Sequence, residues 1–407
     1  MVDVLIVGAG PIGLFLALLL RRQGLDVAII EKREGPVFDP RAAVIWPRTA
    51  EVLAAQGLTL AFARERRLLE GVELNVRGVN RGVLRLRGLA GPESVPWIIE
   101  QHRTEALLRE ALGDVVVRGS HTLTGLTQDA QKVTALVSTP AGETSLEARY
   151  VVGCDGAHSA VRKQLGIEFE GRAHDGLECL QVNADCEWER PPTPGFCRFD
   201  LIPYATLLAV PLPDHGFRFV SFQHARGALE QPTLDEAQAT LSRISGQPLK
   251  LTLTSPQWLT RARFQDRLAA RLRQGRVMLC GDAAAVWAPI GGRGMNVGLL
   301  AAHHLGRKLA LVAHGEADAS LLDHFNVEVR AMVRGVMRTL TFNRLEYPSS
   351  ALALWFIDRA LRTASAQRFV PRPIERLLSL TNLDRRPERR LLAGNAGARR
   401  RFGPAPT

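Results

Sequence analysis

A chain of 407 residues with 46% hydrophobic and 23% charged residues is long enough for one large domain or two to three smaller ones, and its composition excludes a disordered or fibrous protein. The formal net charge of +11 suggests nucleic acid or an anionic membrane surface as a partner. Because no nucleic-acid-binding motif accompanies this charge, we interpret it mainly as arginines spread over solvated surfaces, and we predict no nucleic-acid partner.

The cysteines and the apolar runs indicate the compartment. The five cysteines are odd in number and lack C-x-x-C spacing, which argues against a zinc site or a disulfide framework. No apolar run reaches the ~18–20 residues needed to cross a bilayer. Residues 14–20 are apolar, but no small-residue cleavage site follows them, so they do not indicate a signal peptide. We predict a cytoplasmic protein with no metal and no transmembrane segment.

The first motif lies at the N-terminus. Residues 2–7 predict a buried strand, and the glycines Gly8, Gly10 and Gly13 lead from it into a helix that ends near Gly24. A second strand over residues 26–30 closes with Glu31, which completes the βαβ context of a dinucleotide fingerprint. The three glycines permit the tight turn, the approach of a pyrophosphate and the close packing of helix on strand. The carboxylate of Glu31 suits two ribose hydroxyls and disfavours a 2′-phosphate, so FAD or NAD is expected rather than NADP.

The next segments alternate between the nucleotide domain and a second sheet. Arg41 is either a surface charge or a contact to the middle of a dinucleotide, and a short helix follows over residues 50–56. Residues 68–89 alternate apolar and polar side chains, as half-buried antiparallel strands do. Residues 98–112 predict a return to helix, with Thr104 as a candidate N-cap and with Gln101 and Arg103 just ahead of it.

A second acidic turn and a long β region occupy the middle of the chain. Residues 115–151 predict strands and hairpins, and Asp155 follows the last of them at a helix start. For the nearby His158 we favour a structural role over a catalytic one. Residues 177–223 predict strands separated by prolines, in a mainly antiparallel sheet that could cover a ligand on one face. Four polar side chains of this sheet either polarise a phenol or are ordinary structure: Arg198, Tyr204, His215 and His224.

The third motif is the most informative stretch. A short apolar strand ends at Gly281-Asp282, a Gly-rich loop follows from Pro289 to Asn296, and residues 297–311 predict a helix. The Asp282 carboxylate can accept hydrogen bonds from the hydroxyls of a sugar-like chain. The N–H groups of the loop and the positive end of the helix can meet electron-rich oxygens. Helix is predicted to about residue 361, with breaks near 316–320 and 347–349, before an Arg-rich tail that is solvated or binds a polyanion.

Together the three motifs resemble the single-component FAD-dependent aromatic hydroxylases, the family typified by para-hydroxybenzoate and phenol hydroxylases. The resemblance covers roughly residues 1–330. It implies an α/β protein, α+β overall, in which a Rossmann-like FAD-binding domain (residues 1–70, 98–175 and 262–330) carries an inserted, mainly antiparallel β-sheet substrate domain (71–97 and 176–261). A helical C-terminal region (331–384) and a basic, disordered tail (385–407) complete the expected organisation.

The resemblance also assigns site residues. The ADP half of FAD would be held by Gly8, Gly10, Pro11, Ile12, Gly13, Glu31 and Lys32, and the middle of the cofactor by Arg41 and Gln101. Asp155 would contact the pyrophosphate region indirectly, and Gly281 and Asp282 would meet the ribityl chain. The flavin ring would be lined by Gly294 and Met295 and by four residues assigned to catalysis, Pro289, Gly291, Gly292 and Asn296. Arg198, Tyr204 and His224 remain the candidate substrate residues.

The implied reaction uses NADH or NADPH and O₂ to hydroxylate a phenolic or polyketide-like aromatic substrate through a flavin hydroperoxide, in a monomer or homodimer. Two departures put rate and substrate in doubt: Ala285 stands where the family often has His, and Ala301 where it commonly has Asp. The alternatives are a flavin-dependent halogenase, whose Trp-x-Trp motif is missing here, an FAD-dependent oxidoreductase that inserts no oxygen, and a catalytically lapsed flavin-binding protein. Residues 351–362 either rest on a membrane, as in quinone-pathway relatives, or pack on the core.

Overall fold

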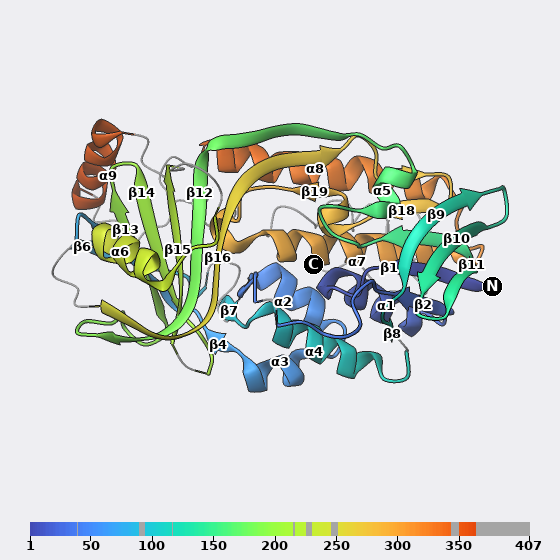
Figure 1. The fold of residues 1–407 in the computed structure, drawn as a ribbon, viewed down its shortest axis with the longest axis horizontal. Coiled ribbons are helices and arrows are strands. Elements are labelled where there is room, and N and C mark those ends of the chain that lie inside the picture. Colours follow the sequence, from blue (N-terminus) through green and yellow to red (C-terminus); the bar gives the residue numbers. More distant parts are fainter. Residues whose placement is uncertain are drawn as a thin grey trace.

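Two large sheets lie toward opposite ends of an elongated molecule, and helices pack between and around them (Figure 1). The computed structural model describes residues 1–363, apart from 39, 89–93, 116, 215, 225–229, 246–250 and 343–349. The predicted break at 347–349, the tail at 385–407 and His215 therefore lie outside the described residues. Within that part, the mixed α/β architecture confirms the predicted fold class.

The first sheet has the N-terminal strand at its centre. Its order is β17 (Arg273–Gln274), β18 (Val277–Leu279), β11 (Gly142–Gly153), β1 (Val2–Val7), β2 (Val27–Ile30) and β8 (Val117–Arg118). Strand β10 (Val133–Thr139) pairs with β11, and β9 (Thr122–Gln128) pairs with β10, so these two strands extend the sheet. The central pairs are parallel, so their carboxyl ends meet at one edge. Because both faces are covered, these strands read in the sequence as continuous apolar runs.

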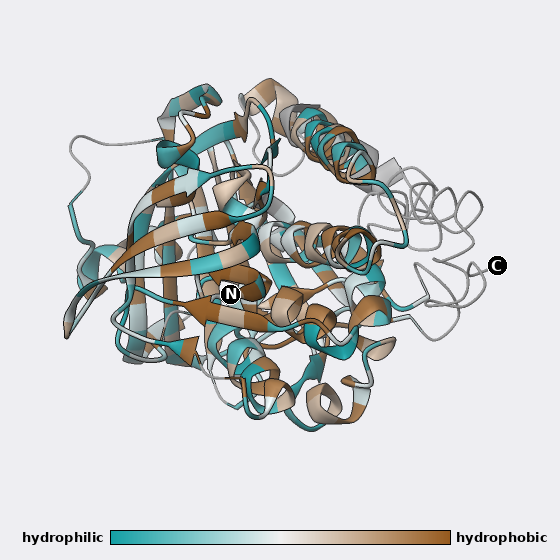
Figure 2. Ribbon diagram, turned by 90° about the vertical axis from the view of Figure 1, so that its right-hand side faces the viewer, coloured by the Kyte–Doolittle hydropathy of each residue, from teal (hydrophilic) through white to brown (hydrophobic). Residues whose placement is uncertain are grey.

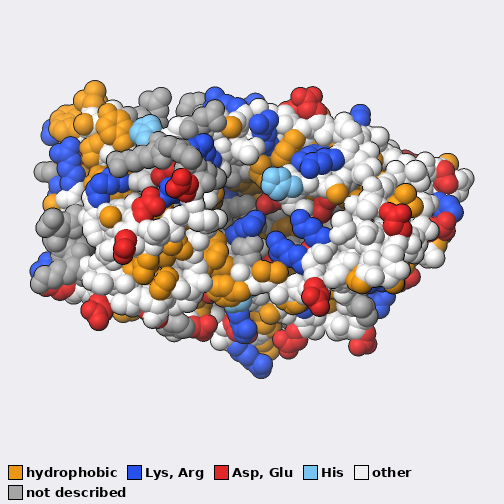
Figure 3. Space-filling view, viewed as in Figure 1, with side chains coloured by type: hydrophobic (Ala, Val, Ile, Leu, Met, Phe, Trp, Pro, Cys, Tyr) orange, Lys and Arg blue, Asp and Glu red, His pale blue; other side chains and the backbone are white. Residues whose placement is uncertain are grey.

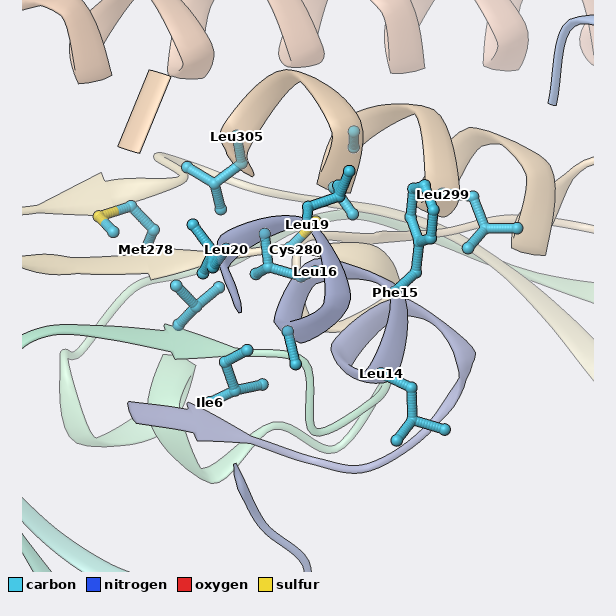
Figure 4. Close-up of a cluster of buried hydrophobic side chains, with 14 of the residues drawn as sticks. Ile6, Leu14, Phe15, Leu16, Leu19, Leu20, Met278, Cys280, Leu299 and Leu305 are labelled. Carbon is cyan, nitrogen blue, oxygen red and sulfur yellow. The ribbon is translucent and has the colours of Figure 1, made fainter. Parts of the chain in front are cut away.

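Helices bury the first sheet and build the main core. They are α1 (Pro11–Arg22), α2 (Pro47–Ala54), α3 (Thr59–Glu65), α4 (Gln101–Leu112), α5 (Ala160–Gln164), α7 (Gly294–Ala313) and α8 (Leu321–Phe342). Helix α1 packs against both α4 and α7. Gly306 lets α7 approach closely, since a Cβ there would lie only 3.2 Å from the Cβ of Leu19. Figure 4 shows Leu16, Leu19 and Leu305 pointing into this shared cluster, with Met278 beside them.

The second sheet is the predicted β-rich region. Its order is β19 (Ala285–Val286), β16 (Leu251–Ala269), β12 (Phe169–Trp188), β15 (Phe217–His224), β14 (Ala205–Pro211), β13 (Phe196–Ile202), β5 (Gly71–Val76) and β6 (Val79–Arg85). Every pair is antiparallel except β5 with β13. Its strands alternate hydrophobic and hydrophilic residues (Figure 2). Helix α6 (Leu234–Ser245) packs on one face, and the opposite face is turned to the site described below.

Two long strands join the halves of the molecule. Strands β12 and β16 pair over most of their length, so the domain boundaries expected at 175/176 and 261/262 fall inside continuous strands. A small third sheet has the order β3 (Val44–Ile45), β7 (Trp97–Ile98) and β4 (Arg67–Leu68), and strands β5 and β6 of the second sheet come between β4 and β7 in the chain. Two 3₁₀ turns, η1 (Gly281–Ala283) and η2 (Ile290–Gly292), and helix α9 (Ala351–Thr363) complete the described elements.

Two predicted helix starts are wrong. Helix α4 is capped by Glu100, and Thr104 lies buried inside it, because the chain enters the helix directly after β7. Gln101 and Arg103 therefore belong to its first turn, where the Gln101 N–H donates to the Ala42 carbonyl. Helix α7 begins three residues earlier than expected, at Gly294. No helix within the described ranges is both long and apolar enough to span a bilayer.

Candidate functional site

A large cavity lies where the carboxyl edge of the first sheet faces the open face of the second. It has a volume of about 960 Å³ and is lined by residues of all three sequence motifs. The surface in Figure 3 is hollowed between the two halves of the molecule, and Lys and Arg side chains gather around that hollow. The three motifs are separated by more than a hundred residues each in the sequence, yet the parallel strands bring their turns to one edge.

The N-terminal glycine loop has the geometry that its fingerprint predicts. Gly8 has φ of +106°, and a Cβ there would lie 2.4 Å from the Cys154 carbonyl oxygen. A Cβ at Gly13 would lie 2.1 Å from the Gly8 carbonyl oxygen, so helix and loop could not pack. A Cβ at Gly10 would meet no atom within 4 Å, because Gly10 faces the cavity. Gly10 also caps α1, whose first N–H groups have no partner within the helix.

Glu31 lies at the carboxyl end of β2, beside the glycine loop. Its carboxylate accepts hydrogen bonds from the N–H groups of Ala9 (2.8 Å) and Arg33 (3.1 Å). The side chain is half-buried and lines the cavity together with the exposed Lys32. Arg109 of α4, which sequence reasoning missed, donates to the Ala9 carbonyl at 3.2 Å and lines the same edge. These positions suit the adenosine half of a dinucleotide.

The second acidic turn organises the start of α5. Asp155 accepts hydrogen bonds from the Ser159 hydroxyl (2.6 Å) and from the N–H groups of Ala160 and Val161 (2.6 and 3.1 Å). Its carboxylate is therefore occupied within the turn, and the turn as a whole borders the cavity. The exposed side chain of His158 also lines the cavity.

A buried arginine ties the second motif to the third. Arg162 donates to the Ala283 carbonyl (3.0 Å) and to the Ala157 carbonyl (2.9 Å), and its guanidinium lies 3.8 Å from the centre of the Phe169 ring. Burial lowers the pKa of Arg162, and the Asp155 carboxylate opposes that shift. Sequence reasoning gave Arg162 no role, because the carbonyl that it bonds in the third motif lies 121 residues away in the chain.

The Gly-Asp turn lies against the glycine loop. Gly281 has φ of +65°, and a Cβ there would press on the Ile12 side chain at 3.0 Å. Ile12 therefore fills the gap between the first motif and the third. The Asp282 side chain is open to the cavity, while the enclosing protein replaces bulk water around it. This desolvation raises the pKa of Asp282, and the positive charge of Arg41 across the cavity partly offsets the rise.

The Gly-rich loop bends sharply before α7. Gly291 and Gly292 have φ of +72° and +60°, which only glycine adopts without strain. The loop from Gly291 to Met295 lines the cavity, as does Pro289, and the first turn of α7 directs its N–H groups toward that space. Fully buried Arg293 lines it as well.

The side chain of Asn296 is turned away from the cavity. It accepts from the Trp46 N–H (2.8 Å) and donates to the carbonyls of Val44 (2.8 Å) and Gly292 (2.9 Å), and it is fully buried. The Trp46 indole adds a bond to the Gly291 carbonyl at 2.9 Å. The direct catalytic role that we expected for Asn296 thus gives way to a positioning role, because every polar atom of its amide is bonded to backbone.

Between these motifs, Arg41 and Gln101 also line the cavity, as expected for the middle of an extended dinucleotide. The Gln101 amide donates to Glu105 at 2.9 Å. Ala285 lines the cavity and is buried, whereas Ala301 is buried within α7. Both departures from the family pattern are therefore accommodated without loss of packing.

The second sheet contributes the apolar wall. The cavity-lining side chains of this sheet are mostly hydrophobic, and those of β5, β13, β14 and β15 come from every second position: Val72, Leu74, Cys197, Phe199, Leu201, Leu208, Val210, Val220 and Phe222. Strand β6 adds the neighbouring residues Val83 and Leu84. A large apolar pocket with few polar groups is typical of a small-molecule site.

Arg218 of β15 is a buried charged side chain that lines the cavity, which Arg81 of β6 also borders. Arg218 donates to Asn183 Oδ1 (2.8 Å), Glu100 (3.2 Å) and the Arg41 carbonyl (3.1 Å). The substrate sheet and the Arg41 segment are thereby joined through one guanidinium. Neither composition nor spacing singles out this residue.

The three candidate substrate residues do not line the cavity. Arg198 alternates with the cavity-facing Cys197 and Phe199, so it points to the other face, where it pairs with Asp200 at 2.8 and 2.9 Å. Tyr204 is 47% exposed in the turn between β13 and β14. His224 is exposed at the end of β15 and contacts the Gly176 carbonyl. Successive residues of a strand face opposite sides of the sheet, and the sequence did not show which of the two sets faces the cavity.

The site fits an extended flavin dinucleotide by its own geometry. Gly10 leaves open the volume that a Cβ would fill. Along the same cavity, the starts of α1 and α7 offer N–H donors, and the Asp282 carboxylate offers an acceptor for ligand hydroxyls. The fold and the site define an FAD-binding protein. In agreement, a family model described as "FAD binding domain" matches residues 1–339, and the chain belongs to that family.

The relatives specify the class further. The chain is 35% identical over 352 residues to a 12-dehydrotetracycline 5-monooxygenase/anhydrotetracycline 6-monooxygenase of Streptomyces rimosus, covering 83% of this chain and 68% of that protein. It is 38% identical over 337 residues to a rifampicin monooxygenase of Streptomyces venezuelae, covering 81% and 68%. The structure of p-nitrophenol 4-monooxygenase from Pseudomonas putida DLL-E4 superposes with a TM-score of 0.76 at 26% identity, covering 93% and 98%. The chain is therefore an FAD-dependent monooxygenase of the aromatic hydroxylase family.

Proposed function

We propose that this protein uses NADH or NADPH and O₂ to hydroxylate an apolar aromatic molecule, a phenol or a polycyclic polyketide. The observation that carries the proposal is the composition of one cavity, with the dinucleotide motifs on one wall and an apolar sheet face on the other. The names of the relatives support both substrate types, since they include monooxygenases of anhydrotetracycline and of pentachlorophenol.

The residues of this chain would hold FAD along the first wall. Gly10 and the N–H groups at the start of α1 would receive the pyrophosphate, Glu31 the adenosine ribose, and Asp282 the ribityl hydroxyls. Pro289 and the backbone from Gly291 to Met295 would border the ring. The chemistry that FAD supplies when bound is reduction by a nicotinamide nucleotide and activation of O₂ for transfer of one oxygen atom.

The second wall positions the substrate and excludes water. An aromatic ring placed against side chains such as Leu208, Val220 and Phe222 loses its hydration, and so does the space where oxygen transfer occurs. Arg218 is held by Asn183 and Glu100, so it offers a fixed positive field rather than a mobile proton donor. We therefore assign specificity to the shape of this wall and name no general acid or base.

The basic edge of the cavity supports a transient nicotinamide nucleotide. Lys32, Arg33 and Arg41 are exposed and line the cavity, and His158 lies on the same lining. Cationic side chains of this kind attract the phosphates of an incoming nucleotide. The choice between NADH and NADPH is left to measurement.

The test combines cofactor content with product analysis. Purified protein should be yellow with bound FAD, and it should oxidise NADH or NADPH faster when a phenol or a polycyclic aromatic is added. Mass spectrometry of the product should show one added oxygen atom, labelled when ¹⁸O₂ is supplied. Product formed without O₂ would support an oxidoreductase that inserts no oxygen, a halide requirement would support a halogenase, and FAD binding without turnover would support a lapsed flavoprotein.

We also propose the division into FAD-binding and substrate domains given above, a cytoplasmic location, and a monomer or homodimer. Limited proteolysis and size-exclusion chromatography with light scattering test the first and the last of these.

A further inference from the structure

Helix α9 has two apolar faces, and only one of them packs on the protein. Leu354 and Ile357 are 1% and 8% exposed and form a cluster with Val76, Leu201 and Phe199. Ile357 also lines the cavity, so the inner face of α9 is part of the substrate wall. Core packing, which the sequence offered as one explanation of this helix, accounts for this face alone.

The outer face of α9 is hydrophobic and open to solvent. Leu352, Trp355 and Phe356 are 65%, 52% and 60% exposed, and their spacing places them on one side of the helix, opposite Leu354. The rings of Trp355 and Phe356 meet edge to face, 5.0 Å between centres. In Figure 3 the corresponding patch is orange and lies at the end of the molecule that carries α9.

The rim of this patch is basic. Arg359 continues the same face one turn on, and its guanidinium lies 5.9 Å from the centre of the Trp355 ring. Arg77 is exposed in the hairpin beside α9, next to the buried Val76. The acidic Asp358 is half-buried and paired with Arg81 at 2.5 Å, so it does not offset this positive rim. An apolar face with an aromatic anchor and cationic edges is typical of helices that lie in the bilayer interface.

The size of the patch distinguishes between occupants. Three side chains of this kind, about half exposed, offer roughly 300–400 Å² of surface, which is below the ~800 Å² that each partner contributes to a stable dimer. A symmetric contact between two copies would also bring their arginine rims together. We propose that the outer face of α9, with Arg77 and Arg359, docks on an anionic lipid bilayer. This docking goes beyond the proposed reaction and does not depend on it, and it would place the apolar wall of the cavity next to the lipid phase.

The test is vesicle flotation of the full-length protein. Vesicles of phosphatidylcholine containing phosphatidylglycerol should carry the protein to the top of the gradient, and phosphatidylcholine alone should carry far less. The triple variant Leu352→Gln, Trp355→Gln, Phe356→Gln should lower partitioning about tenfold or more, because it removes the inserted apolar surface. Its circular dichroism and thermal transition should match the wild type, since all three side chains point to solvent.

Matched controls separate this surface from other exposed residues and charges. The variant Leu136→Gln with Val327→Gln changes exposed apolar side chains elsewhere (49% and 65% exposed) and should leave flotation unchanged. Brominated lipid should quench wild-type tryptophan fluorescence, and Trp355→Phe should abolish most of that quenching while retaining binding.

Four results would overturn the proposal. They are wild-type protein that does not float, equal flotation of the wild type and the triple variant, flotation that is lost only when Arg399, Arg400 and Arg401 are changed to Gln, and a concentration-dependent dimer that the triple variant abolishes.

Discussion

The two walls of the cavity are built by different means. The FAD wall is mostly backbone: Gly8 and Gly13 on one side and Gly291 and Gly292 on the other allow approaches and turns that no other residue permits, and Gly10 leaves the space beside the loop open. The substrate wall is made of side chains, set by the alternation of strands and drawn from five strands that span residues 71–224.

This difference predicts how each wall responds to change. A backbone wall fails abruptly, since a single Cβ either clashes or removes the room for the cofactor. A side-chain wall changes gradually, because a volume or polarity change at one position leaves its neighbours in place. The first wall is therefore suited to one fixed cofactor, and the second to substrates that differ among relatives.

The largest difference is expected between two single alanine substitutions at glycines of the first motif. Gly13→Ala places a Cβ 2.1 Å from the Gly8 carbonyl oxygen and should destabilise the protein by about 3–5 kcal/mol, with little soluble FAD-bound material. Gly10→Ala meets no atom and has a compatible φ of −73°, so its FAD-free stability should change by less than ~1 kcal/mol while FAD binding weakens at least about tenfold. Chemical denaturation and FAD titration measure both. Similar losses of stability in both variants would contradict the division of roles.

Arg162 tests whether the FAD wall depends on one side-chain link. Arg162→Met keeps much of the volume over Phe169 but leaves the carbonyls of Ala157 and Ala283 without their donor, which should lower the free energy of unfolding by about 2–3 kcal/mol. FAD affinity should fall as well, because the second and third motifs lose their connection. Arg162→Lys is the matched control: it keeps the charge but cannot reach both acceptors, so it should rescue only part of the loss. Full rescue would indicate that charge alone matters.

Asp282 separates cofactor binding from stability. Burial raises the pKa of Asp282, so the folded, FAD-free protein holds a proton on this carboxyl more tightly than the unfolded chain does, and this group lowers the stability as the pH rises above the ordinary aspartate value. Asp282→Asn should therefore leave the FAD-free melting temperature at pH 7 unchanged or higher. This gain should disappear as the pH is lowered toward the ordinary aspartate value of ~3.9. FAD affinity should fall about 10–100-fold through loss of a charged acceptor. A lower melting temperature at pH 7 would refute the desolvation argument.

The sequence predicted the FAD wall well because that wall is local. The roles expected for Gly8, Gly10 and Gly13 follow from a βαβ unit of about thirty residues, and the space around each Cα fits the role that the fingerprint assigns to it. The parallel pairing of strands then fixes where Asp155 and Gly281 must lie, because their turns share an edge with Gly8.

The substrate wall was predicted in class but not in residues. Whether Arg198 or its neighbour Phe199 faces the cavity depends on a one-residue phase. In β13, Arg198 and Asp200 share one face and Cys197, Phe199 and Leu201 share the other, and the sequence alone does not show which of these faces is turned to the cavity. Arg218 and Arg162 were missed for a related reason, since each has an acceptor more than a hundred residues away in the chain: the Arg41 carbonyl for Arg218 and the Ala283 carbonyl for Arg162. Long-range pairing of this kind leaves no periodic signal in the chain.

The substrate wall should respond to polarity on one face only. Val220→Thr exchanges a cavity-lining methyl for a hydroxyl and should lower kcat/KM for an apolar aromatic by about five- to tenfold, through the cost of burying a hydroxyl. Val182→Thr makes the same exchange on the opposite face of the sheet, in the cluster under α6, so it should lower stability by about 1–2 kcal/mol and leave kcat/KM unchanged. Steady-state kinetics and denaturation distinguish them. Equal kinetic losses would mean that the two faces are not functionally distinct.

The smallest effects are expected where the sequence suggested polar substrate contacts. Tyr204 and His224 form an exposed aromatic pair, 5.8 Å between ring centres, and neither lines the cavity. Tyr204→Phe and His224→Gln should keep kcat/KM within about twofold of the wild type at every pH, because removal of an exposed polar group seldom exceeds ~0.5 kcal/mol. A pH-dependent loss in either variant would mean that the sheet edge moves onto the substrate during turnover, and the side-chain wall would then include residues that this conformation leaves outside.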